Sequence, residues 1–187
     1  MKKYSRVEAW IHLDRIEENI DLLKGQLCES TKLIAVIKTD GYGHGAIEIG
    51  KVLEKREDIF GFAVAIVEEG IQLRKAGMKK PILLLGAVFE EQQEELFEWS
   101  LMPTLFTLEG AEKLSKLAVS RKQIIPVHMK VDTGMSRIGL QTSKEGFLEA
   151  VEMRKLENLS WEGIFTHMAR DDEVDKTSAG KQIEDFL

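Results

Sequence analysis

The feature of this sequence that most restricts its fold is a regular alternation between short apolar runs and longer amphipathic stretches. Six runs have the length of a β-strand, and several are apolar at nearly every position: residues 33–37, 59–64, 81–85, 101–106, 124–129 and 159–165. Strands that are apolar on both faces are typical of a parallel sheet covered by helices. The alternation therefore predicts an α/β fold built from strand–helix units.

The stretches between the runs carry apolar residues at the spacing of one helix face. In residues 13–27, the apolar positions Ile16, Ile20, Leu23 and Leu27 lie three or four residues apart, as on the buried stripe of an amphipathic helix. Similar patterns predict helices over 46–54, 68–76, 90–99, 109–117, 145–156 and 177–187, and Gly77 stands where the helix over 68–76 would end. Helical crossovers between parallel strands are right-handed, so the chain reads as consecutive βαβ units.

Six strands fit two architectures. An open, doubly wound sheet has this number of strands. A (β/α)8 barrel that is incomplete would also fit, because a closed barrel of this type needs about eight strands and roughly 200 residues or more. The chain has 187 residues and stops inside a helical pattern at residues 184–187. We therefore expect the sequence to be the N-terminal part of a longer chain.

Composition argues against several functional classes. The formal net charge is −6, from 26 Lys and Arg against 32 Asp and Glu, and an acidic chain without a basic stripe is not typical of a nucleic-acid-binding protein. No apolar stretch is long enough to span a membrane, and the N-terminus lacks the apolar core of a secretion signal. Cys28 is the only cysteine, so no internal disulfide can form and we expect a cytoplasmic protein. His12 and His128 have no companions at metal-ligand spacing, so we predict no metal site.

Polar residues of unusual kinds follow the first predicted strand. In parallel α/β folds the reactive groups lie at the carboxyl ends of strands. Lys38 would have a partly desolvated amine there, which favours the neutral form that attacks carbonyl carbons, although a solvated lysine at a strand exit is the simpler reading. Residues 41–45, Gly-Tyr-Gly-His-Gly, precede a helix. This turn could hold an anion such as a phosphate at the helix N-terminus, or it could be an ordinary glycine-rich connection.

The fifth and sixth predicted strands also end in charged or titratable residues. Lys130 lies two positions before Asp132, and if its side chain points inward it is a buried cation that needs a partner. Arg137 follows in a glycine-flanked loop, where it could clamp a carboxylate or a ring oxygen, or simply pair with Asp132. His167 closes the sixth strand, where a lone histidine is more often a hydrogen-bonded core residue than a catalyst.

Three of these segments together resemble the alanine racemases, which are fold-type III pyridoxal-phosphate enzymes. Residues 35–45, Ala-Val-Ile-Lys-Thr-Asp-Gly-Tyr-Gly-His-Gly, are similar to the family's cofactor-lysine motif. Residues 130–139 and 163–169 are similar to a second and a third motif, in the expected order and spacing. The resemblance implies that residues 1–187 form the N-terminal part of a (β/α)8 TIM-type barrel, incomplete with about six strand–helix units and without the family's C-terminal β-domain.

The resemblance also implies a role for each candidate residue. Lys38 would hold pyridoxal 5′-phosphate covalently and exchange the α-proton on the D-alanine side. Tyr42 would lie near the cofactor phosphate, and His167 would lie under the pyridine ring. Arg137 would contact the cofactor's phenolic oxygen and the substrate carboxylate. Lys130 matches a lysine that is often carbamylated in the family, a modification that would turn a buried cation into an anion beside Arg137.

The activity implied by the resemblance is interconversion of L-alanine and D-alanine by removal and return of the α-proton, which would supply D-alanine for the bacterial cell wall. The enzyme would be a homodimer. A serine or broad-specificity racemase of the same fold is an alternative. A non-catalytic pyridoxal-phosphate carrier is another, although such carriers lack the Tyr-Gly-His-Gly and Asp-Thr-Gly-Met segments found here. The family's second base is a tyrosine of the partner subunit's C-terminal domain, so we expect residues 1–187 alone to be inactive.

Overall fold

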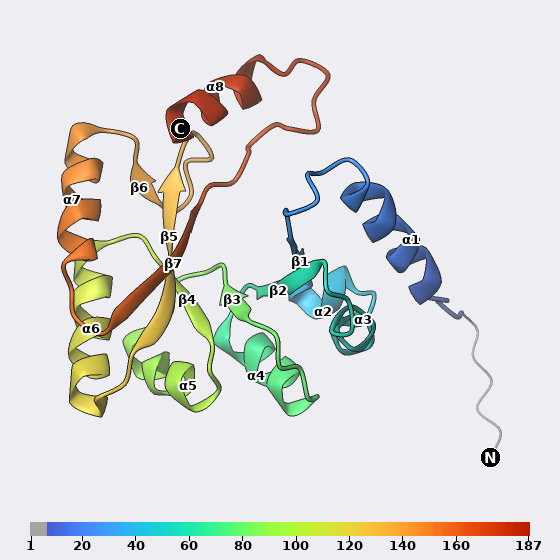
Figure 1. Ribbon diagram of the computed structural model, residues 1–187, viewed down its shortest axis with the longest axis horizontal. Coiled ribbons are helices and arrows are strands. Elements are labelled where there is room, and N and C mark those ends of the chain that lie inside the picture. The colour runs from blue at the N-terminus through green and yellow to red at the C-terminus, as the bar shows by residue number, and fades with distance from the viewer. Residues whose placement is uncertain (1–6) are drawn as a thin grey trace. The chain divides into compact units, whose positions relative to one another are not determined.

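The computed structural model describes residues 7–187 and divides them into two compact units, residues 7–82 and residues 83–187. Parallel strands alternate with helices in each unit (Figure 1), so the predicted α/β class is confirmed. The longest helix of the described residues has 14 residues. None of the described helices combines the length and the apolar character that crossing a membrane requires.

The first unit is built around two parallel strands. β1 (Leu33–Val36) pairs with β2 (Ile59–Val64), with Leu33 opposite Ile59 and Val36 opposite Ala63. The helical segments are α1 (Leu13–Lys24), α2 (Lys38–Tyr42), α3 (Ala46–Leu53) and α4 (Val67–Lys75). β2 is almost completely buried, and the core of the unit is formed by Leu53, Ile59, Phe62, Val64 and Leu73.

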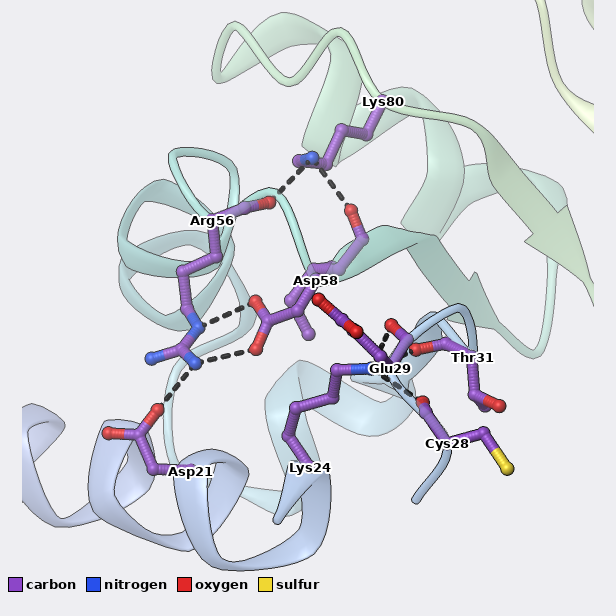
Figure 2. A network of polar contacts seen from close by, with 9 residues as sticks. Asp21, Lys24, Cys28, Glu29, Thr31, Arg56, Asp58 and Lys80 are labelled. Atoms are coloured by element: carbon purple, nitrogen blue, oxygen red, sulfur yellow. Dashed lines mark hydrogen bonds and ion pairs between the residues drawn. The ribbon is translucent and has the colours of Figure 1, made fainter.

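Polar contacts hold α1 to the rest of the first unit (Figure 2). Arg56 donates to both carboxylate oxygens of Asp58 at 3.0 and 2.7 Å and to Asp21 of α1 at 2.5 Å. Lys24 Nζ lies within 3.0 Å of three carbonyl oxygens of the turn that follows α1, those of Cys28, Glu29 and Thr31. No residue of α1 is fully buried, and of the predicted apolar stripe Ile16 and Ile20 are only half-buried while Leu23 is exposed, so polar contacts supplement a partly covered apolar face.

The second unit is organised around β5, which pairs in parallel with β4, β6 and β7. Its strands are β3 (Ile82–Leu84, beginning at the unit boundary), β4 (Met102–Leu105), β5 (Ile125–Asp132), β6 (Leu140–Gln141) and β7 (Leu159–Phe165). Its helices are the 3₁₀ turn η1 (Glu90–Gln92), α5 (Gln93–Glu98), α6 (Leu108–Arg121), α7 (Lys144–Arg154) and α8 (Thr177–Phe186). Pairing between β5 and β7 runs from Ile125 opposite Leu159 to Lys130 opposite Phe165, so both strands end at the same edge.

The predicted strands are all present, with small shifts of their ends. The strand predicted over 124–129 continues to Asp132, so Lys130 and Asp132 both lie on it. The helix predicted over 13–27 ends at Lys24, and that over 90–99 is divided between η1 and α5. Gly77 follows α4 with a φ of 99°, as a residue that ends a helix should. The sequence did not predict β6 or the helical turn α2.

Candidate active site

Lys38 lies two residues after the end of β1, at the start of an unusual turn. Four consecutive residues, Thr39, Asp40, Gly41 and Tyr42, have φ values of 54°, 53°, 62° and 54°, so α2 is a single left-handed turn. This conformation costs roughly 1–2 kcal/mol for each residue that is not glycine. The turn therefore needs strong contacts to persist. It differs from an ordinary glycine-rich loop because three of its four residues with positive φ are not glycine.

Carboxylates fix the left-handed turn at both of its ends. The N–H of Thr39 donates to Oε1 of Glu69 at 2.6 Å, and the N–H of Ala65 donates to Oε2 of the same residue at 2.7 Å. Glu69, in α4, thereby joins the segments that follow β1 and β2. At the other end, the N–H of Ala46 donates to Oδ1 of Asp40 at 2.9 Å. The first N–H of α3 is thus occupied by a side chain of the turn and is not available for the anion that the sequence suggested.

The turn presents a lysine and a tyrosine together. Lys38 is half-buried, and its Nζ lies 5.8 Å from the ring centroid of Tyr42. The Tyr42 side chain is exposed. Nδ1 of His44 lies 3.2 Å from the carbonyl oxygens of both Gly41 and Tyr42, and since carbonyls only accept, a protonated Nδ1 braces the turn. The described geometry places a half-buried lysine amine next to a phenol on a turn that two carboxylates fix.

In the second unit, a buried carboxylate organises the loop that carries Arg137. Oδ1 of Asp132 accepts hydrogen bonds from the N–H groups of Gly134 and Ser136, each at 3.0 Å. Burial alone would raise the pKa of Asp132, but these N–H donors and the nearby ammonium of Lys130 lower it below its ordinary value. The loop returns at Gly139, whose φ is 135° and where a Cβ would lie 2.5 Å from the backbone nitrogen of Asp132. Only glycine fits this return.

Arg137 is exposed and does not form the pair with Asp132 that the sequence left open. Within residues 7–187 no hydrogen bond or ion pair holds its guanidinium, and Asp132 is engaged with backbone N–H groups instead. The rigid loop therefore presents a guanidinium whose donors are available for an anionic ligand.

Lys130 is buried on β5, as expected if its side chain points inward. The residue is 3% exposed, its Nζ donates to the carbonyl of Val131 at 2.7 Å, and it lies 5.6 Å from the ring centroid of Phe165. Burial lowers the pKa of Lys130, the charge of Asp132 opposes that effect, and the positive charge of Arg137 reinforces it. A lower pKa increases the fraction of Lys130 in the neutral amine form, and the neutral amine is the form that reacts with electrophiles.

His167 follows β7, and its side chain is exposed. Its backbone carbonyl accepts from Nε2 of Gln182 at 3.1 Å. One residue earlier, Oγ1 of Thr166 lies 2.8 Å from Oγ1 of Thr133 at the end of β5. The loops that carry Arg137 and His167 are therefore connected where they leave β5 and β7, through the hydroxyl groups of Thr133 and Thr166.

The candidate residues form two groups, Lys38 and Tyr42 in the first unit, and Lys130, Arg137 and His167 in the second. The residues that fix each group, Glu69 and Gln182, were not identified from the sequence. Each acts on segments far away along the chain, and no local pattern distinguishes it from a surface residue.

Comparison with known proteins gives the family. The model of the family "Alanine racemase, N-terminal domain" matches residues 11–187. The chain belongs to this alanine racemase family. It is 36% identical to the alanine racemase of Clostridium tetani over 181 residues, which are 97% of this chain and 46% of that protein. It is 41% identical to the alanine racemase of Carboxydothermus hydrogenoformans over 180 residues, 96% of this chain and 48% of that protein.

Solved structures of the family have the same fold. An alanine racemase from Clostridium difficile 630 matches with a TM-score of 0.90 and 42% identity, over 94% of this chain and 46% of that one. The chain spans about half the length of the curated relatives that it matches. Of the two architectures left open by the strand count, the similarity supports the TIM-type barrel, of which these residues match one part. A histidine racemase from Leuconostoc mesenteroides, 22% identical, shares the fold with a TM-score of 0.84.

Proposed function

We propose that the intact protein is a pyridoxal-phosphate-dependent racemase that interconverts L-alanine and D-alanine. The observation that carries this proposal is the placement of Lys38 at the end of β1, on a left-handed turn fixed by Glu69 and Asp40. This lysine lies inside the segment by which the chain resembles alanine racemases, and the chain belongs to that family. A clostridial relative was solved in complex with cycloserine, with 41% identity over 98% of this chain and 50% of that one.

The described residues fit the cofactor. Pyridoxal phosphate, when bound, supplies an electron-withdrawing ring that makes the α-hydrogen of an amino acid acidic. The half-buried amine of Lys38 would hold the group covalently, and Tyr42 lies next to that amine with its side chain exposed. Arg137 is exposed and, among the residues that the structure describes, has no partner for its guanidinium donors, and His167 is exposed just after β7.

The chain's own residues would divide the work of proton exchange. Lys38 would take or return the α-proton on one face of the substrate through its Nζ. Arg137 would hold the substrate carboxylate, which fixes the face that the amine meets. We assign the base on the opposite face to a residue outside this chain, following the family resemblance, and the intact protein would then act as a homodimer.

We also propose that Lys130 carries a carbamate. A neutral lysine amine attacks the carbon of carbon dioxide, a nitrogen–carbon bond forms and one proton is released. The burial of Lys130 and its depressed pKa favour the neutral amine, and the charge of Arg137 would then stabilise an anion where it now opposes a cation. Carbon-13 NMR of protein equilibrated with labelled carbon dioxide would test this, because Lys130→Met should lose a carbamate signal that Lys32→Met keeps.

The decisive experiment uses the protein expressed from its complete gene. The purified protein should absorb visible light, borohydride should attach the cofactor to the peptide that contains Lys38, and L-alanine should be converted to D-alanine. Lys38→Ala should abolish all three results, while Lys32→Ala, an exposed lysine just before β1, should leave them unchanged. Turnover that survives in Lys38→Ala would contradict the proposal.

The same assay separates the alternatives. Faster turnover of L-serine than of L-alanine would indicate a serine or broad-specificity racemase. Cofactor binding without turnover of any amino acid would indicate a carrier. For the preferred function we infer a cytoplasmic enzyme that provides D-alanine for the bacterial cell wall, in line with the family resemblance and with the single cysteine, Cys28. Growth of a gene-disrupted strain only when D-alanine is added would support that role.

A further inference from the structure

The side chain of Gln182 is a buried amide that makes three hydrogen bonds within the second unit. The residue belongs to α8 and is 3% exposed. Its Nε2 donates to Oγ1 of Thr133 at 2.9 Å and to the carbonyl of His167 at 3.1 Å, and its Oε1 accepts from the N–H of Ala169 at 2.9 Å. One amide therefore binds the segment after β5 and the segment after β7.

The orientation of this amide follows from its backbone partners. The N–H of Ala169 can only donate and the carbonyl of His167 can only accept, so the oxygen must face Ala169 and the nitrogen must face His167. The second hydrogen of the amide then points to Thr133. A carboxylate could not donate to His167, and an apolar side chain could make none of these bonds. At neutral pH the amide supplies both the donors and the acceptor that these partners need.

The contacts of Gln182 continue into the loops that carry the candidate residues. The Thr133 hydroxyl accepts from Gln182 and lies 2.8 Å from the Thr166 hydroxyl, so the ends of β5 and β7 are joined twice. Thr133 opens the loop that contains Arg137, and His167 is bound directly through its carbonyl. A shift of Gln182 would move both loops together.

We propose that Gln182 is a positioning residue that sets the relative placement of Arg137 and His167 for binding a phosphorylated aromatic cofactor and the carboxylate of its substrate. The cofactor part of this inference rests on the function proposed above. Gln182 would not touch the reacting groups, because it acts on the backbone behind Arg137 and His167. The only other buried residue of α8 is Ala179, so the amide also provides much of the attachment of this helix.

The first test measures amide hydrogen exchange in the cofactor-free protein. Gln182→Met keeps the length of the side chain and removes every hydrogen bond, so exchange at Ala169 should become faster by about tenfold, the factor expected for loss of one hydrogen bond of ordinary strength. Lys181→Ala, an exposed neighbour on the same helix, should leave that exchange unchanged. Equal exchange at Ala169 in Gln182→Met and the unmodified protein would overturn the inference.

A second variant distinguishes hydrogen bonding from packing. In Gln182→Glu the ionised carboxylate can still accept from the N–H of Ala169, but it repels the carbonyl of His167 instead of donating to it and so pushes this segment away, whereas a protonated carboxyl group can donate to that carbonyl. The difference from the unmodified protein at Ala169 should therefore shrink as the pH is lowered, whereas in Gln182→Met it should persist. A difference that does not change with pH in Gln182→Glu would mean that the side chain acts only by filling space, and would count against the proposed role.

The third test uses the cofactor-loaded protein from the complete gene, well below its unfolding temperature. Because Gln182 acts on the Arg137 and His167 loops and not on Lys38, Gln182→Met should raise KM for alanine and the cofactor dissociation constant by about tenfold, with a smaller fall in kcat. Unchanged KM and cofactor affinity would overturn the positioning role. If the unmodified protein binds no pyridoxal phosphate, the proposed function fails, and amide exchange alone then decides whether Gln182 couples the two loops.

Discussion

The two units of the molecule join neighbouring strand ends in the same way but with different side chains. In the first unit Glu69 binds the segments after β1 and β2, and in the second unit Gln182 binds the segments after β5 and β7. The first pair of segments presents two N–H groups, which a carboxylate satisfies because it only accepts. The second pair presents an N–H, a carbonyl and a hydroxyl, which need an amide. The backbone groups exposed at each strand end therefore determine which residue can connect them.

The two units also differ in how they hold the candidate residues that each of them carries. The turn after β1 holds Lys38 on three non-glycine residues with positive φ, Thr39, Asp40 and Tyr42. The loop after β5 is instead organised around the buried carboxylate of Asp132, with positive φ mainly at glycines. The first arrangement depends on external contacts to hold a strained backbone. We therefore expect the first unit to be more sensitive to loss of its connecting side chain than the second.

The largest effect should come from Glu69→Gln. The amide would offer a donor to one of the two N–H groups that Glu69 now accepts, so one charge-assisted hydrogen bond is lost and two donors are forced together. We expect the free energy of unfolding to fall by about 3 kcal/mol, and turnover by the intact protein to fall with it because Lys38 is displaced. Urea unfolding measures the first quantity, with the exposed Glu57→Gln as control. A loss smaller than that of Gln182→Glu would refute the proposed difference between the units.

Parts of the fold and of the candidate site could be predicted from the sequence, and the rest could not. The six longer strands were predictable because two-sided burial leaves continuous apolar runs. β6, with two residues, is too short to leave such a run. The sequence indicates only part of the left-handed turn, since glycines such as Gly41 and Gly43 often adopt positive φ, whereas Thr39 and Asp40 rarely do. Gln182 meets Thr133 across 49 positions, and contacts of that kind have no local pattern.

A smaller effect, of opposite sign, should follow Lys130→Met. Lys130 is buried, whereas Lys38 is half-buried. Removing the charge from water therefore lowers the stability of the folded protein at Lys130 but not at Lys38. Replacing a buried charge by an apolar side chain of similar length is often neutral or stabilising, and here we expect a gain of about 1 kcal/mol, the lower end of the usual range. We expect residues 1–187 in carbon-dioxide-free buffer to gain stability from Lys130→Met and none from Lys38→Met, while both changes reduce turnover by the intact protein.

The same substitution has a pH signature. The pKa of Lys130 is lower in the folded protein than its ordinary value of 10.5, so the unfolded chain binds this proton more tightly. The free energy of unfolding should therefore rise as the pH increases toward 10.5, and this rise should be absent in Lys130→Met. Denaturation curves at several alkaline pH values would test the prediction, and parallel pH profiles for the two proteins would contradict it.

The smallest effect should be a loss of stability in weak acid that is confined to the second unit. His128 is buried on β5, its ring lies 6.2 Å from that of Phe165, and a Cβ at Gly163 would come within 2.6 Å of the imidazole. Burial lowers the pKa of His128 below the ordinary value of 6.5, with partial opposition from Glu162.

The unfolded chain therefore takes up a proton below about pH 6.5 that the folded chain resists, and the free energy of unfolding should decrease as the pH falls through that value. The first unit has no such buried imidazole among its described residues, because His12 and His44 are both exposed. Hydrogen exchange resolved by residue at pH 7 and pH 5.5 should therefore show faster opening of β5 and β7 but not of β1 and β2. His128→Gln should remove the difference, and an equal acid response in both units would show that burial of this imidazole does not control it.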